Sequence, residues 1–172
     1  MEHHWDEAFG YFGVPVDYPT GFPEAGSTED RFWARYTFDR NELIDVNGPL
    51  MNAYIDGRAA IVNRDYATKD ASRTIIYDTH ELVAAATSVH YINTSLAALD
   101  NGEIGELFHQ ISEGYMFVNS MKYSPNKKIT QAQIDEILNT DFGTDGDFWK
   151  VTNAGLIKAR NTIVSVYPEL AD

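Results

Sequence analysis

The sequence contains no cysteine, and this absence excludes disulfide bonds, thiolate nucleophiles and metal sites built from cysteine ligands. The redox compartment is therefore left undetermined. No uninterrupted apolar run approaches the roughly eighteen residues that a membrane span requires, so no transmembrane segment is expected in this chain. The opening residues MEHHWDEAFGYF lack the basic and apolar regions of a signal peptide and indicate a helix instead.

Basic residues are also scarce. The chain has 13 Lys and Arg against 26 Asp and Glu, which gives a formal net charge of -13. Such a charge repels phosphate backbones and anionic lipid surfaces, so nucleic acid is a poor partner. Serine nucleophile elbows, Walker loops, H-E-x-x-H and G-x-G-x-x-G are absent, and no motif indicates catalysis.

The composition is nevertheless that of a folded protein, because 44% of the residues are hydrophobic and 13% are aromatic. A chain of 172 residues can bury roughly 70% of its unfolded surface in one core. We expect a single helical domain over residues 1–172.

One long stretch, from Tyr66 to Asp100, contains neither proline nor glycine. Its apolar residues recur at alternating steps of three and four, which is typical of a helix with a buried stripe. Small residues crowd its middle, in the segment AAATS at 84–88, so that neighbouring helices can approach closely. The stretch predicts a long central helix around which the rest of the chain packs.

Further helices are predicted on both sides of it. The expected ranges are 2–12, a helix that begins at 27–30, 49–64, 103–123, 130–138 and 147–167. Between the first two, prolines at 15, 19 and 23 favour an extended segment, which Tyr18 and Phe22 are expected to hold down. No alternation long enough for a sheet is present. The predicted fold class is all-α, a multi-helix up-and-down bundle around the long central helix.

The helix predicted at 49–64 has two unusual residues in its interior. Gly57 costs about 1 kcal/mol of helix propensity relative to alanine, which is tolerable if a neighbouring helix packs there. Arg58 falls on the apolar stripe, so we expect its stem to be buried and its guanidinium to pair with a carboxylate.

The N-terminal helix carries the best candidate site, formed by His3, His4, Asp6 and Glu7. His4 and Glu7 stand at i, i+3, and His3 and Glu7 at i, i+4, so either pair can present a nitrogen and a carboxylate to one metal ion. The alternative is an exposed turn in which the acids favour the helix dipole and the histidines are solvated. Residue types alone favour this alternative, because two ligands do not complete a site.

Other clusters are weaker. Glu106 and His109 have the E-x-x-H spacing of di-iron carboxylate proteins, with Glu113 one turn beyond, but a second copy of the motif is missing. These residues also lie opposite the apolar stripe, which indicates a solvated face. His90 shares the apolar face of the long helix and is expected to be a core histidine.

Aspartates around Gly146 are similar to a calcium loop, at positions 141, 145 and 147. Gly143 occupies the third position, however, and Thr152 stands where the bidentate glutamate is required. This mismatch excludes an EF-hand and leaves a surface acidic cluster.

Four segments carry a resemblance to a known family. They are HHWDEAFGYFGVP (3–15), YIDGRAAIVNRDYATKD (54–70), VAAATSVHYIN (83–93) and MKYSPNKKITQAQIDEIL (121–138). On these segments the chain resembles the family called domain of unknown function 4856. The resemblance implies longer helical proteins of Gram-negative bacteria, typically exported as lipoproteins and often encoded beside imelysin-like iron-regulated proteins and TonB-dependent receptors. The chain is similar to the C-terminal part of such a protein.

The resemblance also implies a location in the cell envelope and a link to iron. The family is similar to imelysins, which carry a histidine and a glutamate three residues apart; the equivalents here are His4 and Glu7. Imelysins have a glycine two residues before that histidine, whereas this chain has Glu2.

Together these features predict a non-enzymatic helical domain of the cell envelope, connected with iron acquisition. It binds iron, another divalent metal or a ferric ligand, or docks to an outer-membrane receptor or imelysin-like protein. His4 and Glu7 are the expected ligands, with His3 and Asp6 as lesser candidates. The alternatives are a metal-dependent peptidase of the imelysin type and a purely structural protein-interaction module.

Overall fold

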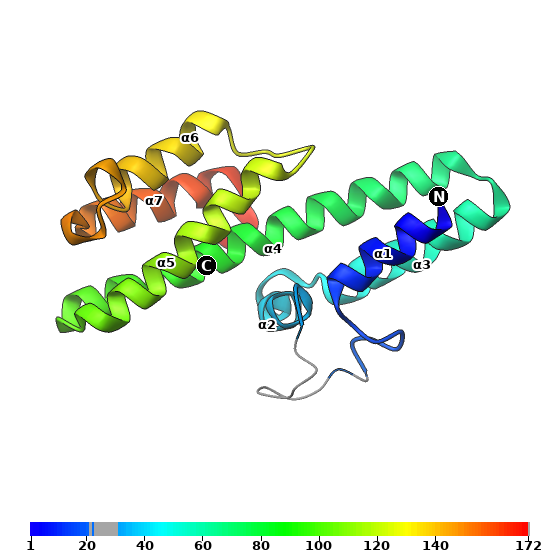
Figure 1. Cartoon of the computed structure of the whole chain (residues 1–172), viewed down its shortest axis with the longest axis horizontal. Coiled ribbons are helices and arrows are strands. Elements are labelled where there is room, and N and C mark those ends of the chain that lie inside the picture. The colour runs from blue at the N-terminus through cyan, green and yellow to red at the C-terminus, as the bar shows by residue number, and fades with distance from the viewer. Residues whose placement is uncertain (21, 23–30, 172) are drawn as a thin grey trace. The chain divides into compact units, whose positions relative to one another are not determined.

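The structure, a computed structural model, describes residues 1–20, 22 and 31–171. It is 80% helical, with seven α-helices and no strand in the described part of the chain, so the all-α prediction is confirmed (Figure 1). The chain divides into two compact units, Met1–His80 and Glu81–Asp172. The predicted single domain over 1–172 stays a prediction.

The long helix α4 spans Tyr66–Asn101, 36 residues, which confirms the predicted central helix. Its middle is buried, including the small residues at 84–88. The Ser88 hydroxyl donates to the carbonyl of Ala84 at 2.8 Å, so this buried polar group is satisfied within the helix. By length and composition α4 is the one described helix able to cross a membrane, but 56% of its most apolar window is buried, as in a core helix.

The first unit contains α1 (Glu2–Phe12), α2 (Ala34–Ile44), α3 (Asn47–Asn63) and the first part of α4. Gly13 ends α1 in the left-handed conformation, with φ 83°. Aromatic rings form much of the core, and Phe12 stacks on Tyr54 with ring centroids 5.4 Å apart. This unit therefore depends on aromatic packing between α1 and α3.

Tyr18 and Phe22, in the proline-bearing segment after α1, are held down as predicted. Tyr18 is buried, and its hydroxyl donates to the side-chain oxygen of Asn47 at the start of α3. Phe22 packs against the core, with its ring centroid 5.4 Å from that of Tyr18. The helix start expected at 27–30 lies outside the described residues.

The second unit contains the rest of α4, α5 (Ile104–Ser120), α6 (Gln131–Glu136) and α7 (Asn153–Val166). A capping box begins α6, with the Thr130 and Gln133 side chains each bonded to the other's backbone N–H. A π-helical turn, Ile137–Asp141, continues α6. The prediction that the last helix begins at Asp147 is wrong, because Val151 and Thr152 are extended and the Thr152 side chain caps α7.

Glu81 is a buried carboxylate of this unit. Tyr167 donates its hydroxyl to Glu81 Oε1 at 2.5 Å, and the backbone N–H of Lys128 donates to the same oxygen at 2.6 Å. Burial, followed by the hydrogen bond to Glu81, raises the pKa of Tyr167 well above its ordinary range. The carboxylate therefore ties the C-terminal residues and the 124–130 loop to α4.

Two sequence-based expectations are wrong in this unit. Asp141, expected in a surface cluster, is buried, and Lys158 Nζ lies 2.9 Å from its Oδ1 and 2.6 Å from Glu136 Oε1. Burial raises the pKa of Asp141, whereas the bond to Lys158 lowers it. His90, expected in the core, is exposed, because the buried face of α4 runs through Val89 and Ile92 instead.

Candidate functional site

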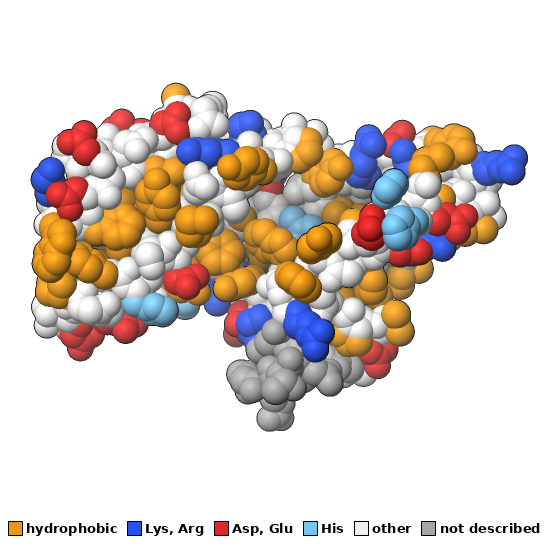
Figure 2. All heavy atoms as spheres, in the orientation of Figure 1, with side chains coloured by type: hydrophobic (Ala, Val, Ile, Leu, Met, Phe, Trp, Pro, Cys, Tyr) orange, Lys and Arg blue, Asp and Glu red, His pale blue; other side chains and the backbone are white. Residues whose placement is uncertain are grey.

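The first turns of α1 bring three of the four predicted ligands together. His3 Nε2 lies 3.2 Å from Glu7 Oε1, and His4 Nδ1 lies 3.1 Å from Glu7 Oε2. The side chains of His3 and His4 are 80% and 81% exposed, and that of Glu7 is 52% exposed. Figure 2 shows histidine and carboxylate side chains next to one another on the surface. One carboxylate thus contacts two imidazoles that face solvent.

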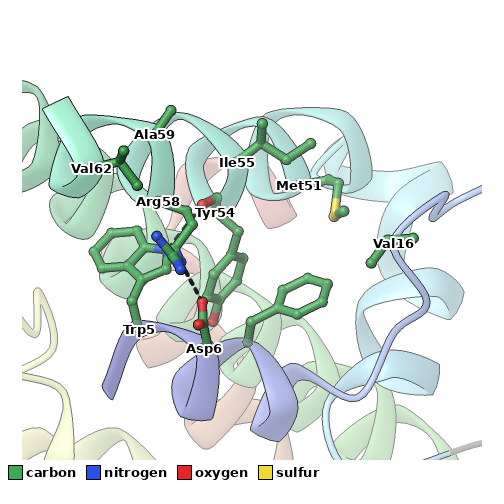
Figure 3. A pocket seen from close by; sticks show the side chains of 10 residues that line it. Trp5, Asp6, Val16, Met51, Tyr54, Ile55, Arg58, Ala59 and Val62 are labelled. Carbon is green, nitrogen blue, oxygen red and sulfur yellow. Dashed lines mark hydrogen bonds and ion pairs between the residues drawn. The ribbon is translucent and has the colours of Figure 1, made fainter. Parts of the chain in front are cut away.

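The fourth predicted ligand, Asp6, has a different partner. Arg58 donates from Nε to Asp6 Oδ1 at 2.6 Å (Figure 3). Its Nη2 lies 3.0 Å from Glu2 Oε2. The hydrogen bond to Asp6 is the main cause that raises the pKa of Arg58. The expected pairing of Arg58 with a carboxylate is confirmed, and in this arrangement Asp6 joins α1 to α3 rather than joining the histidines.

The separation of the donor atoms bears on metal binding. With metal–ligand bonds of about 2.0–2.2 Å, donor atoms in neighbouring coordination positions lie about 3 Å apart. The His4–Glu7 and His3–Glu7 separations match this spacing. No group of three or more His, Asp or Glu side chains in the described part of the chain is arranged to hold a metal ion by itself. Further donors would have to come from water, a chelator or a partner.

His4 also lines a pocket of about 240 Å³ between α1, α3 and α4. Lys69 and Arg73 line the same pocket, and both contact Asp70, with nitrogen–oxygen distances of 2.5 and 3.2 Å. The remaining lining includes the side chains of Trp5, Tyr54, Ile61, Ile76 and Tyr77. Two cations against one carboxylate favour an anionic group beside His4.

A second and larger cavity, about 470 Å³, lies on the other side of Trp5. It is an open groove between α1 and α3 that Val16 closes at one end (Figure 3). Apart from Asp6 and Arg58, its lining is apolar or aromatic: Trp5, Phe9, Val16, Met51, Tyr54, Ile55, Ala59 and Val62. Trp5 and Tyr54 line both cavities.

Trp5 is fixed by α3. Its indole Nε1 donates to the backbone carbonyl of Tyr54 at 2.9 Å. Its ring lies directly over Gly57, where an added Cβ would stand 2.0 Å from Trp5 Cζ2. The expectation that a helix packs at Gly57 is confirmed, and the missing side chain is what lets α1 approach α3.

His80 is a half-buried histidine of the first unit for which the sequence predicted no role. Its Nε2 lies 3.2 Å from the Tyr54 hydroxyl, and the rings of Phe12 and Trp33 lie 5.5 Å away. Burial lowers the pKa of His80 from 6.5 to about 4, so the ring is neutral near pH 7. Its position could have been predicted from spacing. Ser72, Ile76 and His80 recur at steps of four residues, and all three lie on the face of α4 toward α1–α3.

Comparison with known families gives a match over nearly the whole chain. A family model matches residues 1–169. The chain belongs to the family described as domain of unknown function (DUF4856). No curated protein and no solved structure gives a significant match. The comparisons therefore assign no site residues to this DUF4856 domain.

Within the DUF4856 domain, the weaker candidate on α5 remains a solvated face. Glu106 and His109 are both exposed, and Glu106 Oε1 accepts a hydrogen bond from the side chain of Gln110 at 2.5 Å. His109 thus serves as a comparison residue for the histidines of α1, since it is exposed and has an acidic residue three positions away.

Proposed function

We propose that this DUF4856 domain is a binding domain of the cell envelope that takes part in iron acquisition. Its ligand would be a metal ion, iron in the family context, carried by an anionic chelator. The observation that supports this most is that Glu7 contacts both His3 and His4 beside a pocket that also holds Lys69 and Arg73. The envelope location, the link to iron and a partner such as an outer-membrane receptor or imelysin-like protein rest on the family resemblance.

The protein donors support a chelate better than a bare ion. Glu7 together with His4, or alternatively with His3, can fill two coordination positions, and the remaining positions need other donors. A chelator such as citrate supplies carboxylate oxygens for iron and carries negative charge. Lys69 and Arg73 would attract that charge, with Asp70 offsetting one of the two.

A peptidase is less well supported than a binding role. Metal-dependent hydrolysis requires a general base beside the metal-bound water. Asp6, the additional carboxylate nearest in sequence to Glu7, already binds Arg58. Peptide turnover that a chelating agent abolishes and added zinc or iron restores would establish the alternative.

The test is equilibrium dialysis against ferric citrate, followed by measurement of bound iron by mass spectrometry. We expect saturable uptake by the wild type and loss of about tenfold or more in affinity for His4→Ala and Glu7→Ala, with a smaller loss for His3→Ala. His109→Ala is the matched control and should leave uptake unchanged. Equal, negligible uptake by all of these proteins would end the metal hypothesis.

A second pair of variants tests the chelator. Lys69→Gln and Arg73→Gln should weaken binding of ferric citrate and leave binding of aqueous nickel, which needs only the imidazole and carboxylate donors, largely unchanged. Lys150→Gln removes an exposed lysine from the other unit and serves as control. If Lys69→Gln and Arg73→Gln bind ferric citrate as the wild type does, the pocket lined by Lys69 and Arg73 plays no part in binding.

A further inference from the structure

The groove between α1 and α3 has the form of a helix-binding site. On α3 its lining recurs at positions 51, 55, 58–59 and 62, a single stripe that corresponds to about 16 Å of helix. On α1, Trp5 and Phe9 stand one turn apart and form the facing wall. Met51, at one end of the stripe, is buried, whereas Ile55 is 52% exposed and Val62 is 59% exposed. The part of the stripe from Ile55 to Val62 is therefore not covered by any described part of the chain.

The two walls run antiparallel, because Trp5 lies over Gly57 and Phe9 lies beside Tyr54, with ring centroids 5.4 Å apart. Both walls are helices whose backbone groups are already bonded internally, so a strand could gain no main-chain pairing here. A third helix would complete a three-helix layer by inserting its side chains between the two walls.

The charges around the groove indicate which sign of charge a partner should carry. Among residues that line the groove or adjoin a lining residue along the chain, Arg58 is the only Lys or Arg. The carboxylates in the same set are Asp6, Glu7, Asp17 and Asp56. Arg58 is itself paired with both Asp6 and Glu2. The rim therefore carries an excess of negative charge that basic side chains would complement.

We infer that this groove docks a basic amphipathic helix of a partner protein, with apolar residues on one face over about three turns and Lys or Arg on its flanks. The apolar face would contact Ile55, Ala59 and Val62 on one side and Trp5 and Phe9 on the other. Its basic flanks would face Asp56 and Asp17. This inference goes beyond the proposed iron binding and does not depend on it, because none of the lining side chains is a proposed metal ligand except Asp6, the lesser candidate.

The test uses a synthetic peptide of about fourteen residues, with leucine at i, i+3, i+4, i+7 and i+11 and lysine at the remaining positions. Fluorescence anisotropy at physiological ionic strength should show saturable binding to the wild type. Ile55→Ser and Val62→Ser should each weaken peptide binding by about tenfold, since each removes a large apolar side chain that the bound peptide would cover. Both positions are exposed, so folding should be retained, as circular dichroism can verify.

Ile75→Ser is the matched control, because Ile75 is an exposed isoleucine of the same unit that does not line the groove. It should bind the peptide as the wild type does, and His4→Ala should do so as well, because His4 does not line the groove and is not one of its carboxylates. This variant separates the result from the iron test. A scrambled peptide, and one with glutamate in place of lysine, should bind at least tenfold more weakly.

Three outcomes would overturn the inference. One is peptide binding that is equally strong in Ile55→Ser and Val62→Ser. Another is saturable binding of laurate together with no peptide binding, which would assign the groove to a small amphiphile. The third is a stable dimer of the wild type in solution that Ile55→Ser dissociates, which would assign it to a second copy of this chain.

Discussion

Acid should destabilise the first unit through His80, and the size of the effect follows from its surroundings. The ring is enclosed by Phe12, Trp33 and Tyr54, and burial lowers its pKa from 6.5 to about 4. A group with a lowered pKa in the folded state binds protons more readily when unfolded. Its contribution is therefore intact above pH 6.5 and is lost progressively as the pH falls from 6.5 to about 4.

The magnitude comes from the two pKa values. Between about pH 7.5 and about pH 5, protonation of the unfolded ring lowers the free energy of unfolding by about 2 kcal/mol. The assay is denaturant unfolding across this range, with His80→Gln as the variant, because glutamine can still accept a hydrogen bond from Tyr54 and does not titrate. The loss of stability from pH 7.5 to 5 should be about 2 kcal/mol smaller in His80→Gln than in the wild type. Parallel pH profiles would refute the reasoning.

Two further predictions concern packing. Gly57→Ala places a Cβ 2.0 Å from the Trp5 ring and should lower the free energy of unfolding by about 1–3 kcal/mol, with tryptophan fluorescence shifted to the red, because α1 can no longer lie on α3. Tyr167→Phe removes one of the two hydrogen bonds to the buried carboxylate of Glu81. It should lower the free energy of unfolding by about 1.5–3 kcal/mol, measured by denaturant unfolding.

The chain offers matched controls for both. Gly48→Ala lies in the same helix as Gly57, but nothing stands within 4 Å of its added Cβ, so it should be close to neutral. Tyr123→Phe removes the hydroxyl of an exposed tyrosine and should also be close to neutral. A Gly57→Ala variant as stable as Gly48→Ala would contradict the contact between α1 and α3.

The helical architecture could be predicted because its signals are local. The long helix α4 contains no proline or glycine, the capping box at Thr130 lies within four residues, and Gly13 marks the end of α1. The start of α7 was predicted too early because the apolar residue Phe148 fits the helical period. The Thr152 cap, which sets the true start, competes with that pattern.

Buried polar residues could not be predicted in the same way. His90 is predicted in the core but is exposed, and the buried residue Glu81 has its partner 86 residues away, Tyr167. Such burial depends on which distant segments meet. Asp141 was misplaced for the same reason, since Lys158 reaches it from α7.

In the candidate site, too, contacts within one helix could be predicted, whereas contacts between helices could not. Contacts of Glu7 with His3 and His4 follow from helical spacing and are present. That Asp6 binds Arg58 instead depends on the packing of α1 against α3, as does the groove beside Trp5. Spacing alone therefore predicts the contacts of Glu7 with His3 and His4, but neither the partner of Asp6 nor the cavities beside these residues.

Histidine side-chain NMR during a titration with gallium citrate, a diamagnetic substitute for ferric citrate, tests the proposed site most directly. The account predicts that the imidazole resonances of His3 and His4 shift and saturate, that those of His109 do not move, and that Glu7→Ala abolishes the shifts. Resonances of His3 and His4 that stay unchanged up to saturating gallium citrate would contradict it.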